Sequence, residues 1–139
     1  MNKTIGFIGS GNMGGAMIGG IIKAGLTARE SIYVSDINED SLARVRESYG
    51  VNTTTDNAEL AKVCDIIVLS VKPFLYPVVI NQIKDVVKED VIIVVIAAGQ
   101  SSAAVAQLFG REIKIVKTMP NTPALVGEGM AAIAPAKNV

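Results

Sequence analysis

The feature that most constrains the fold is a short apolar segment that runs directly into a cluster of glycines. Residues 5–8 read I-G-F-I, and Gly9, Gly11 and Gly14 follow in the spacing G-x-G-x-x-G, just ahead of a helix-like stretch at 13–24. In such a turn the first glycine permits the tight bend, the second lets the backbone approach a pyrophosphate, and the third lets the helix pack closely on the strand. The segment therefore predicts a strand–turn–helix unit that binds a dinucleotide. The alternative is a glycine turn with a purely structural role.

The rest of the chain alternates between strand-like and helix-like segments. The strand patterns cover residues 4–8, 32–36, 51–54, 65–71, 91–97, 112–117 and 130–134. Helical patterns cover residues 13–24, 38–49 and 76–87. Two further helices end near residues 63 and 109, and Asp56 or Asn57 could cap the first of them and Ser101 or Ser102 the second. Because several strands are apolar throughout, this alternation predicts an α/β fold with a doubly wound parallel sheet of the Rossmann type. Residues 1–139 then form one domain.

Composition excludes several classes of partner. The 13 basic and 13 acidic residues balance, and no long run of like charge is present, which argues against nucleic acid or an anionic membrane surface. The longest apolar run, residues 91–98, is too short to span a bilayer. We therefore expect a cytoplasmic protein without membrane or nucleic-acid partners.

Two residue types limit the possible chemistry. The chain has no histidine, and Cys64 is its single cysteine. This combination excludes the usual zinc sites, internal disulfides and histidine-activated nucleophiles. We expect no metal site and assign no catalytic acid, base or nucleophile, and we interpret Cys64 as a small core residue.

The ends of the predicted strands indicate where a ligand binds. In a doubly wound sheet, ligands lie outside the carboxyl ends of the strands. The residues at these ends are Gly9–Gly14, Asp36, Ser70–Pro73, Ala97–Gly99 and Met119–Pro123. Apart from Asp36, they are rich in small residues or proline, and small residues leave room for a flat cofactor. The alternative, that all are merely tight turns, explains one such segment more easily than five.

Asp36 and Lys72 are the charged candidates at these ends. An acid at the end of the second strand commonly accepts hydrogen bonds from the ribose hydroxyls of NAD and repels the 2′-phosphate of NADP. Asp36 could instead only cap the following helix, and Arg44 or Arg46 could reach a phosphate. Lys72 could hold a phosphate or a substrate carboxylate, or could lie at a solvated rim.

Four segments together resemble a known family. They are I-G-F-I-G-S-G-N-M at residues 5–13, V-K-P at 71–73, A-A-G at 97–99 and M-P-N-T-P-A-L-V at 119–126. In this order and at these intervals they resemble the Δ1-pyrroline-5-carboxylate reductases, which catalyse the last step of proline synthesis. The resemblance runs along essentially the whole chain, and the segment at 119–126 is its most specific part.

The resemblance implies an oxidoreductase that reduces a cyclic imine to L-proline with hydride from NADPH or NADH. Asn121 and Thr122 would lie near the nicotinamide and the imine. Where Asp36 stands, members that prefer NADP often carry small or hydroxyl residues, so Asp36 favours NADH, although Ser35 and Asn38 could still accommodate a phosphate. The residues expected to bind the cofactor are Ile8, Gly9, Ser10, Gly11, Asn12, Met13, Ser35, Asp36, Asn57, Ser70, Val71, Lys72, Pro73, Ala97, Ala98 and Gly99.

The resemblance also implies two domains with different functions. In the family a C-terminal helical domain supplies the dimer interface and most substrate contacts, and this chain does not contain it. We therefore expect the chain to be the cofactor half of a longer protein that acts on a small-molecule substrate. Alone it should bind a dinucleotide, turn over little substrate and form no homo-oligomer.

Two other functions remain open. Enzymes of the β-hydroxyacid dehydrogenase type also open with G-F-I-G-x-G-x-M-G, although their sixth strand is not usually followed by M-P-N-T-P. A non-enzymatic domain that senses NAD(H) is the second alternative.

Overall fold

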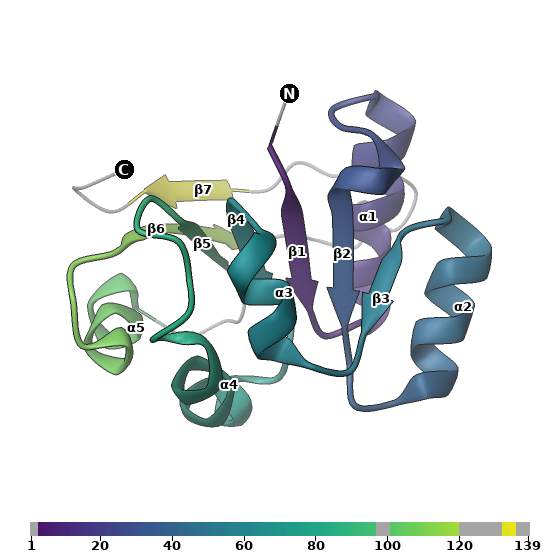
Figure 1. Cartoon of the computed structure of the whole chain (residues 1–139). Coiled ribbons are helices and arrows are strands. Elements are labelled where there is room, and N and C mark those ends of the chain that lie inside the picture. The colour runs from purple at the N-terminus through teal and green to yellow at the C-terminus, as the bar shows by residue number, and fades with distance from the viewer. Residues whose placement is uncertain (1–2, 97–100, 120–131, 136–139) are drawn as a thin grey trace.

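In a computed structural model, the chain forms a single mixed sheet flanked by helices on both faces (Figure 1). The structure describes residues 3–96, 101–119 and 132–135. The strands are β1 (Ile5–Ile8), β2 (Ile32–Ser35), β3 (Asn52–Thr54), β4 (Ile66–Leu69), β5 (Ile92–Val95), β6 (Lys114–Met119) and β7 (Ala132–Pro135). The helices are α1 (Asn12–Ala24), α2 (Glu39–Tyr49), α3 (Asn57–Val63), α4 (Tyr76–Ile83) and α5 (Ser102–Phe109). The predicted order of strands and helices is confirmed.

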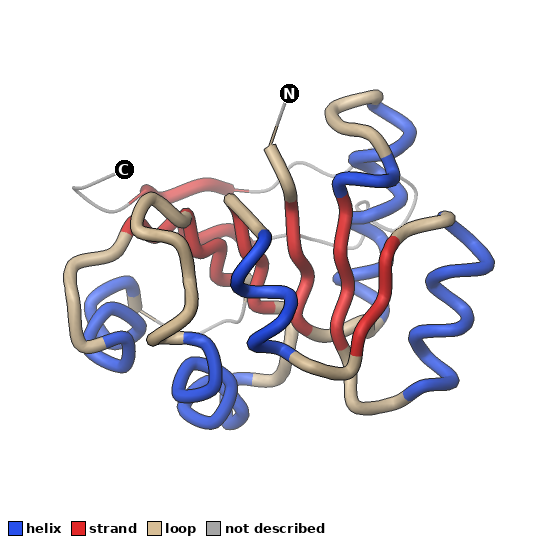
Figure 2. Tube along the Cα trace, viewed as in Figure 1, coloured by secondary structure: helices blue, strands red, loops and turns tan. Residues whose placement is uncertain are grey.

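The sheet has the order β3-β2-β1-β4-β5-β6-β7 (Figure 2). The first six strands are parallel, as predicted, and β7 pairs antiparallel with β6. A parallel pairing needs a crossover connection, usually a helix, and the sequence has no helical pattern between β6 and β7, which accounts for the antiparallel pairing. The strand order reverses between β1 and β4, which is where ligands bind in sheets of this type.

Each face of the sheet has its own apolar core. Alternate residues of a strand point to opposite faces, so Phe7 packs with Ile18 of α1 on one face, while Ile8 packs with residues of α3, α4 and α5 on the other. Figure 1 shows α1 behind the sheet and α3 in front of it. At Gly6 a Cβ would lie 2.5 Å from the Leu60 Cδ2 atom, so this glycine lets α3 approach β1 closely. Burial on both faces explains why these strands are apolar throughout.

Side-chain caps define where the helices begin. The Asn38 side chain accepts hydrogen bonds from two N–H groups of α2, Asp56 does the same for α3, and Ser101 accepts one from α5. The structure therefore selects Asp56 over Asn57 and Ser101 over Ser102. Gly25 and Gly50 end their helices with φ of 68°.

Cys64 lies in the core between α3 and β4, as its sequence context predicted. Burial raises the pKa of its thiol to about 12, so the group stays protonated at neutral pH. None of the helices in the described part of the chain has the length and apolarity that crossing a bilayer requires.

Candidate functional site

A groove of about 790 Å³ lies at the carboxyl ends of β1, β2 and β4, next to the point where the strand order reverses. Residues from three predicted strand ends meet there, together with side chains from the neighbouring helices α3 and α4. Its lining consists of Ile8, Gly9, Ser10, Gly11, Ser35, Asp36, Ile37, Asn57, Ser70, Val71, Lys72, Leu75, Val78, Val79, Gln82 and Ile96. The structure thus brings together residues that are up to 88 positions apart in the chain (96 − 8).

The turn after β1 is held to both neighbouring strands by hydrogen bonds. The Gly9 N–H donates to the Ser35 carbonyl oxygen at the end of β2, over 2.8 Å. The Ser70 Oγ atom, after β4, lies 2.9 Å from the Ile8 carbonyl oxygen and 2.8 Å from that of Gly9, so its hydrogen is shared between them. Gly9 has φ of 102°, a conformation that residues with a side chain rarely adopt. These hydrogen bonds fix the position of the turn after β1, whose residues line the groove.

Space for a ligand exists at the second glycine of the motif. A Cβ placed on Gly11 would meet no atom within 4 Å, whereas a Cβ on Gly14 would lie 2.9 Å from the Gly9 carbonyl oxygen. Gly14 therefore serves close packing between helix and turn. Gly11 leaves open space at the N-terminus of α1, where unpaired backbone N–H groups and the positive end of the helix dipole favour an anion. This geometry fits a pyrophosphate.

Asp36 links the ends of β1 and β2. Its Oδ2 atom accepts hydrogen bonds from the Ser10 N–H, over 2.9 Å, and from the Ser10 hydroxyl, over 2.7 Å. Its Oδ1 atom accepts one from the Asn38 N–H, over 2.9 Å. Asn38, and not Asp36, caps α2 through its side chain. The carboxylate is only partly buried and lines the groove, so its oxygens are accessible to a ribose hydroxyl.

The same contacts alter the titration of Asp36. Partial burial by itself would raise its pKa, but the hydrogen bonds from Asn38, Ser10 and Ile37 outweigh burial and hold the pKa below the ordinary value of 3.8. Because the folded-state pKa is depressed, the stabilisation is fully present above pH 3.8 and is lost as the pH falls through the folded-state pKa.

We expect Asp36→Asn to lower the free energy of unfolding at pH 7 by about 1 kcal/mol or less, because the carboxylate is partly exposed. The difference from the wild type should shrink as the pH falls below 4. Urea denaturation of both proteins between pH 7 and pH 3 measures it. A difference that grows on acidification would contradict the prediction.

Some of the residues predicted to bind the cofactor are not in the described lining of the groove, and others lie outside the residues that the structure describes. Pro73 begins the 3-10 turn Pro73–Leu75 beside the groove and is not part of its described lining. Asn12 and Met13 form the first residues of α1. Ala97, Ala98, Gly99, Asn121 and Thr122 lie outside the described residues. Lys72 is exposed and lines the groove at its edge, which agrees with the interpretation of a solvated rim and still leaves it able to meet an anion.

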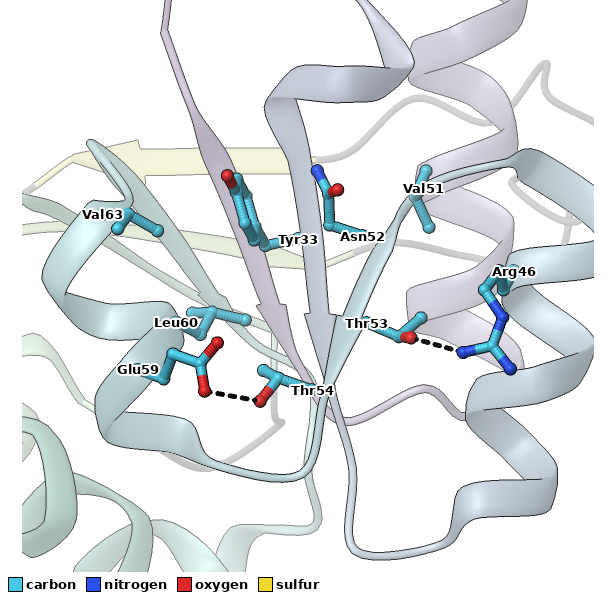
Figure 3. Close-up of a pocket in the computed structure, with 9 residues that line it drawn as sticks. All are labelled: Tyr33, Arg46, Val51, Asn52, Thr53, Thr54, Glu59, Leu60 and Val63. Atoms are coloured by element: carbon cyan, nitrogen blue, oxygen red, sulfur yellow. Dashed lines mark hydrogen bonds between the residues drawn. The ribbon is translucent and has the colours of Figure 1, made fainter.

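The two arginines considered as phosphate ligands differ in position. Arg46 donates to the Thr53 hydroxyl over 2.8 Å, and it lines a second hollow of about 460 Å³ at the β3 edge of the sheet (Figure 3). That hollow contains none of the residues predicted to bind the cofactor. Arg44 lines a third hollow, of about 410 Å³, which shares Ser10 and Gly11 with the groove. Arg44 is therefore the arginine that a phosphate near the glycine turn could meet.

Part of the lining was not predicted from the sequence, namely Ile37, Leu75, Val78, Val79, Gln82 and Ile96. Ile37 has 92% of its surface exposed, and Val78 has 57% exposed. Val78 and Gln82 are four residues apart on α4, opposite the buried face formed by Tyr76, Val79, Ile80 and Ile83. Only the fold shows that this side of α4 borders the groove, because the helical pattern at residues 76–87 does not indicate what its exposed side faces.

The groove offers few titratable groups. Asp36 and Lys72 are the only ones in its described lining. Within the described residues, no three His, Cys, Asp or Glu side chains gather where they could hold a metal ion. What these residues can do chemically is bind and orient a ligand.

Comparison with known proteins agrees with this geometry. Residues 4–99 match the family described as "NADP oxidoreductase coenzyme F420-dependent". Among curated proteins, the chain is 39% identical over 135 residues to pyrroline-5-carboxylate reductase of Escherichia coli (strain K12), covering 97% of this chain and 50% of the relative. It is 36% identical over 137 residues to that of Methanosarcina acetivorans, covering 99% and 51%. The chain thus spans about half the length of these relatives.

Solved structures show the same relationship. A pyrroline-5-carboxylate reductase from Coxiella burnetii superposes with a TM-score of 0.94 at 32% identity, over 100% of this chain and 52% of the other. The Plasmodium falciparum pyrroline carboxylate reductase with NADP bound superposes with a TM-score of 0.86 at 36% identity, over 99% and 50%. The chain belongs to the NADP oxidoreductase coenzyme F420-dependent family, and along nearly its whole length it is similar to pyrroline-5-carboxylate reductases.

Proposed function

We propose that the groove holds the dinucleotide cofactor of a pyrroline-5-carboxylate reductase. The observation that carries this proposal is the convergence of the glycine turn, Asp36 and Ser70 on one groove, with open space at Gly11. The family description names NADP, and one similar structure contains it. A nicotinamide dinucleotide is therefore the cofactor class that fits both the geometry and the comparisons.

Each part of the groove would bind one part of the cofactor. The N–H groups at the start of α1 would hold the pyrophosphate, and the Asp36 carboxylate would accept from a ribose hydroxyl. Asn57 would lie at the adenosine end, with Ser70 to Pro73 and Ala97 to Gly99 toward the nicotinamide. When bound, the reduced nicotinamide supplies hydride. The chain's described residues contribute binding and orientation.

The proposed reaction is the reduction of the imine of 1-pyrroline-5-carboxylate to L-proline. Hydride forms a new C–H bond at the imine carbon, and the nitrogen takes up a proton. Similarity to the reductases supports this substrate, as does the segment M-P-N-T-P at residues 119–123. We further propose that residues 1–139 are the cofactor domain of a protein with a second, substrate-binding domain.

Titration of the chain with NADH and NADPH, followed by calorimetry, tests cofactor binding. Binding of either one supports the proposal, and binding of neither overturns it. Oxidation of NADPH or NADH with pyrroline-5-carboxylate, compared with the reaction on hydroxyisobutyrate, tests the substrate in a protein that contains both domains. Turnover of hydroxyisobutyrate alone would instead support a β-hydroxyacid dehydrogenase. Binding without turnover of either would support a dinucleotide sensor.

For the choice of cofactor, we propose a preference for NADH. The Asp36 carboxylate is held at the end of β2 by hydrogen bonds from Ser10 and Asn38, and its pKa lies below the ordinary value, so it is charged at neutral pH. A negative charge there repels a 2′-phosphate. The competing observation is Arg44, which lies near Ser10 and favours NADPH.

Asp36→Ser should shift the ratio of the two dissociation constants toward NADPH by about tenfold or more. The reason is that two unit charges about 4 Å apart repel by roughly 1–4 kcal/mol near a protein surface. Calorimetric titration of both cofactors measures the ratio. Asp40→Ser is the matched control, because Asp40 is an exposed acid in the first turn of α2 and does not line the groove. An unchanged ratio in Asp36→Ser would show that Asp36 does not face the 2′ position.

A further inference from the structure

A row of three polar side chains crosses the end of the groove between β2, α3 and α4. The Ser35 hydroxyl donates to the Asn57 Oδ1 atom over 2.6 Å. The Asn57 Nδ2 atom in turn donates to the Gln82 Oε1 atom over 2.7 Å. Two of the three side chains, Ser35 and Asn57, were expected to bind the cofactor, while Gln82 was not.

The inner end of this row is fixed by burial. Ser35 has no exposed surface. A buried hydroxyl without a hydrogen-bond partner costs about 1–3 kcal/mol. Asn57 supplies that partner, so its side chain is held against the sheet.

The hydrogen-bond inventory of Asn57 shows what remains for a ligand. An asparagine amide has two N–H donors and an oxygen with two lone pairs. The contacts with Ser35 and Gln82 use one donor and one lone pair. One donor and one acceptor therefore remain on a side chain that lines the groove. A ribose hydroxyl, which both donates and accepts, matches this pair.

Gln82 holds the outer end of the Asn57 amide. The Ser35 hydroxyl contacts only one end of that amide, at Oδ1. In the structure the Gln82 carbonyl accepts from Asn57 Nδ2, so the amide is held at both ends with Oδ1 toward Ser35. Gln82 is held on α4, whose opposite face is anchored in the core by Tyr76, Val79 and Ile80.

We propose that Gln82 is a positioning residue for the cofactor, which orients the Asn57 amide so that one N–H and one lone pair face the adenosine ribose. This inference rests on the proposed function and adds to it a residue that no sequence motif marks. Gln82 acts through Asn57 and need not touch the reacting atoms.

Three variants test the proposal. Gln82→Leu removes the acceptor, and we expect it to weaken binding of NADH and of ADP-ribose about 5- to 10-fold, the effect of losing roughly one hydrogen bond. Gln82→Glu has only acceptor oxygens at this position, so it should restore most of the lost affinity for NADH and ADP-ribose. Asn81→Leu is the matched control, because Asn81 is the neighbouring exposed amide on α4 and does not line the groove. It should leave both dissociation constants unchanged.

A spectroscopic readout separates orientation from a general structural effect. In 15N-correlated NMR spectra, the Asn57 side-chain amide can be assigned from its disappearance in Asn57→Asp. We expect Gln82→Leu to shift this signal, Gln82→Glu to keep it hydrogen-bonded, and Asn81→Leu to leave it in place. The backbone spectrum of Gln82→Leu should otherwise match the wild type, because Gln82 is exposed.

The outcomes distinguish this inference from the proposed function. If the wild type binds neither NADH nor ADP-ribose, the proposed function itself is wrong. If the wild type binds and Gln82→Leu binds equally well, only the role of Gln82 is wrong. If Gln82→Glu is as weak as Gln82→Leu, orientation of the Asn57 amide is not the reason for the loss.

Discussion

Gly11→Val is expected to weaken binding of NADH and NADPH at least about 100-fold, since it would displace a pyrophosphate from two or more charge-assisted hydrogen bonds worth roughly 1.5–3 kcal/mol each. A Cβ at Gly11 would meet no atom within 4 Å, and the valine side chain would extend into the space next to the first N–H groups of α1. The fold should persist. Gly11 is the N-cap of α1, and a valine there costs about 1 kcal/mol, or roughly 3–5 °C in Tm.

Calorimetric titration together with thermal melting checks this expectation. Gly20→Ala is the matched control in the same helix, because a Cβ there also meets no atom within 4 Å and Gly20 does not line the groove. Gly11→Ser distinguishes loss of helix capping from loss of space for the pyrophosphate. Serine is a good N-cap, so the helix should not lose stability. Binding of the cofactor should still weaken. Unchanged affinity in Gly11→Val would show that the pyrophosphate does not lie at this turn.

Gly9→Ala is expected to lower the free energy of unfolding by about 3 kcal/mol or more, from backbone strain of roughly 1–3 kcal/mol plus overpacking. Gly9 has φ of 102°, and its Cβ would lie 2.9 Å from the Ser70 carbonyl oxygen and 2.9 Å from the Val71 Cγ1 atom. The oxygen belongs to the backbone after β4, so it cannot move without shifting the strand end. The mutation should therefore also disturb the shared hydrogen bond from Ser70.

Urea denaturation of Gly9→Ala and the wild type measures this loss. Gly20→Ala again serves as the control, and it should match the wild type or be more stable by about 0.5–1 kcal/mol, because alanine is favoured over glycine inside a helix. Stability of Gly9→Ala equal to that of the wild type would mean that the turn relaxes without cost. Gly9 and Gly11 thus differ, since Gly11 leaves open space at the start of α1 and Gly9 provides the bend.

The roles of Gly9, Gly11 and Gln82 depend on the tertiary structure to different extents. The sequence motif already separates the roles of Gly9 and Gly11. The packing of Gly9 against Ser70, by contrast, joins residues 61 positions apart (70 − 9) and appears only in the fold. For Gln82, no motif marks the residue, and its contact with Asn57 exists only because α3 and α4 lie side by side.

The sequence by itself determined the elements and their order. Local signals were sufficient for this: apolar strands buried on both faces, glycines that end helices, polar caps and the spacing of the first turn all act within a few residues. The same signals placed Asp36 at a strand end and predicted a groove at the carboxyl edge of the sheet.

Only the tertiary structure decided the details of the groove and the edge of the sheet. It selected Arg44 over Arg46 as the arginine near the glycine turn, bound Asp36 to Ser10, and placed Ile37, Val78 and Gln82 in the lining. It also paired β7 antiparallel with β6. The physical reason is that these facts depend on which distant segments meet, and pairing between strands and packing between helices leave no periodic trace in the sequence of either partner.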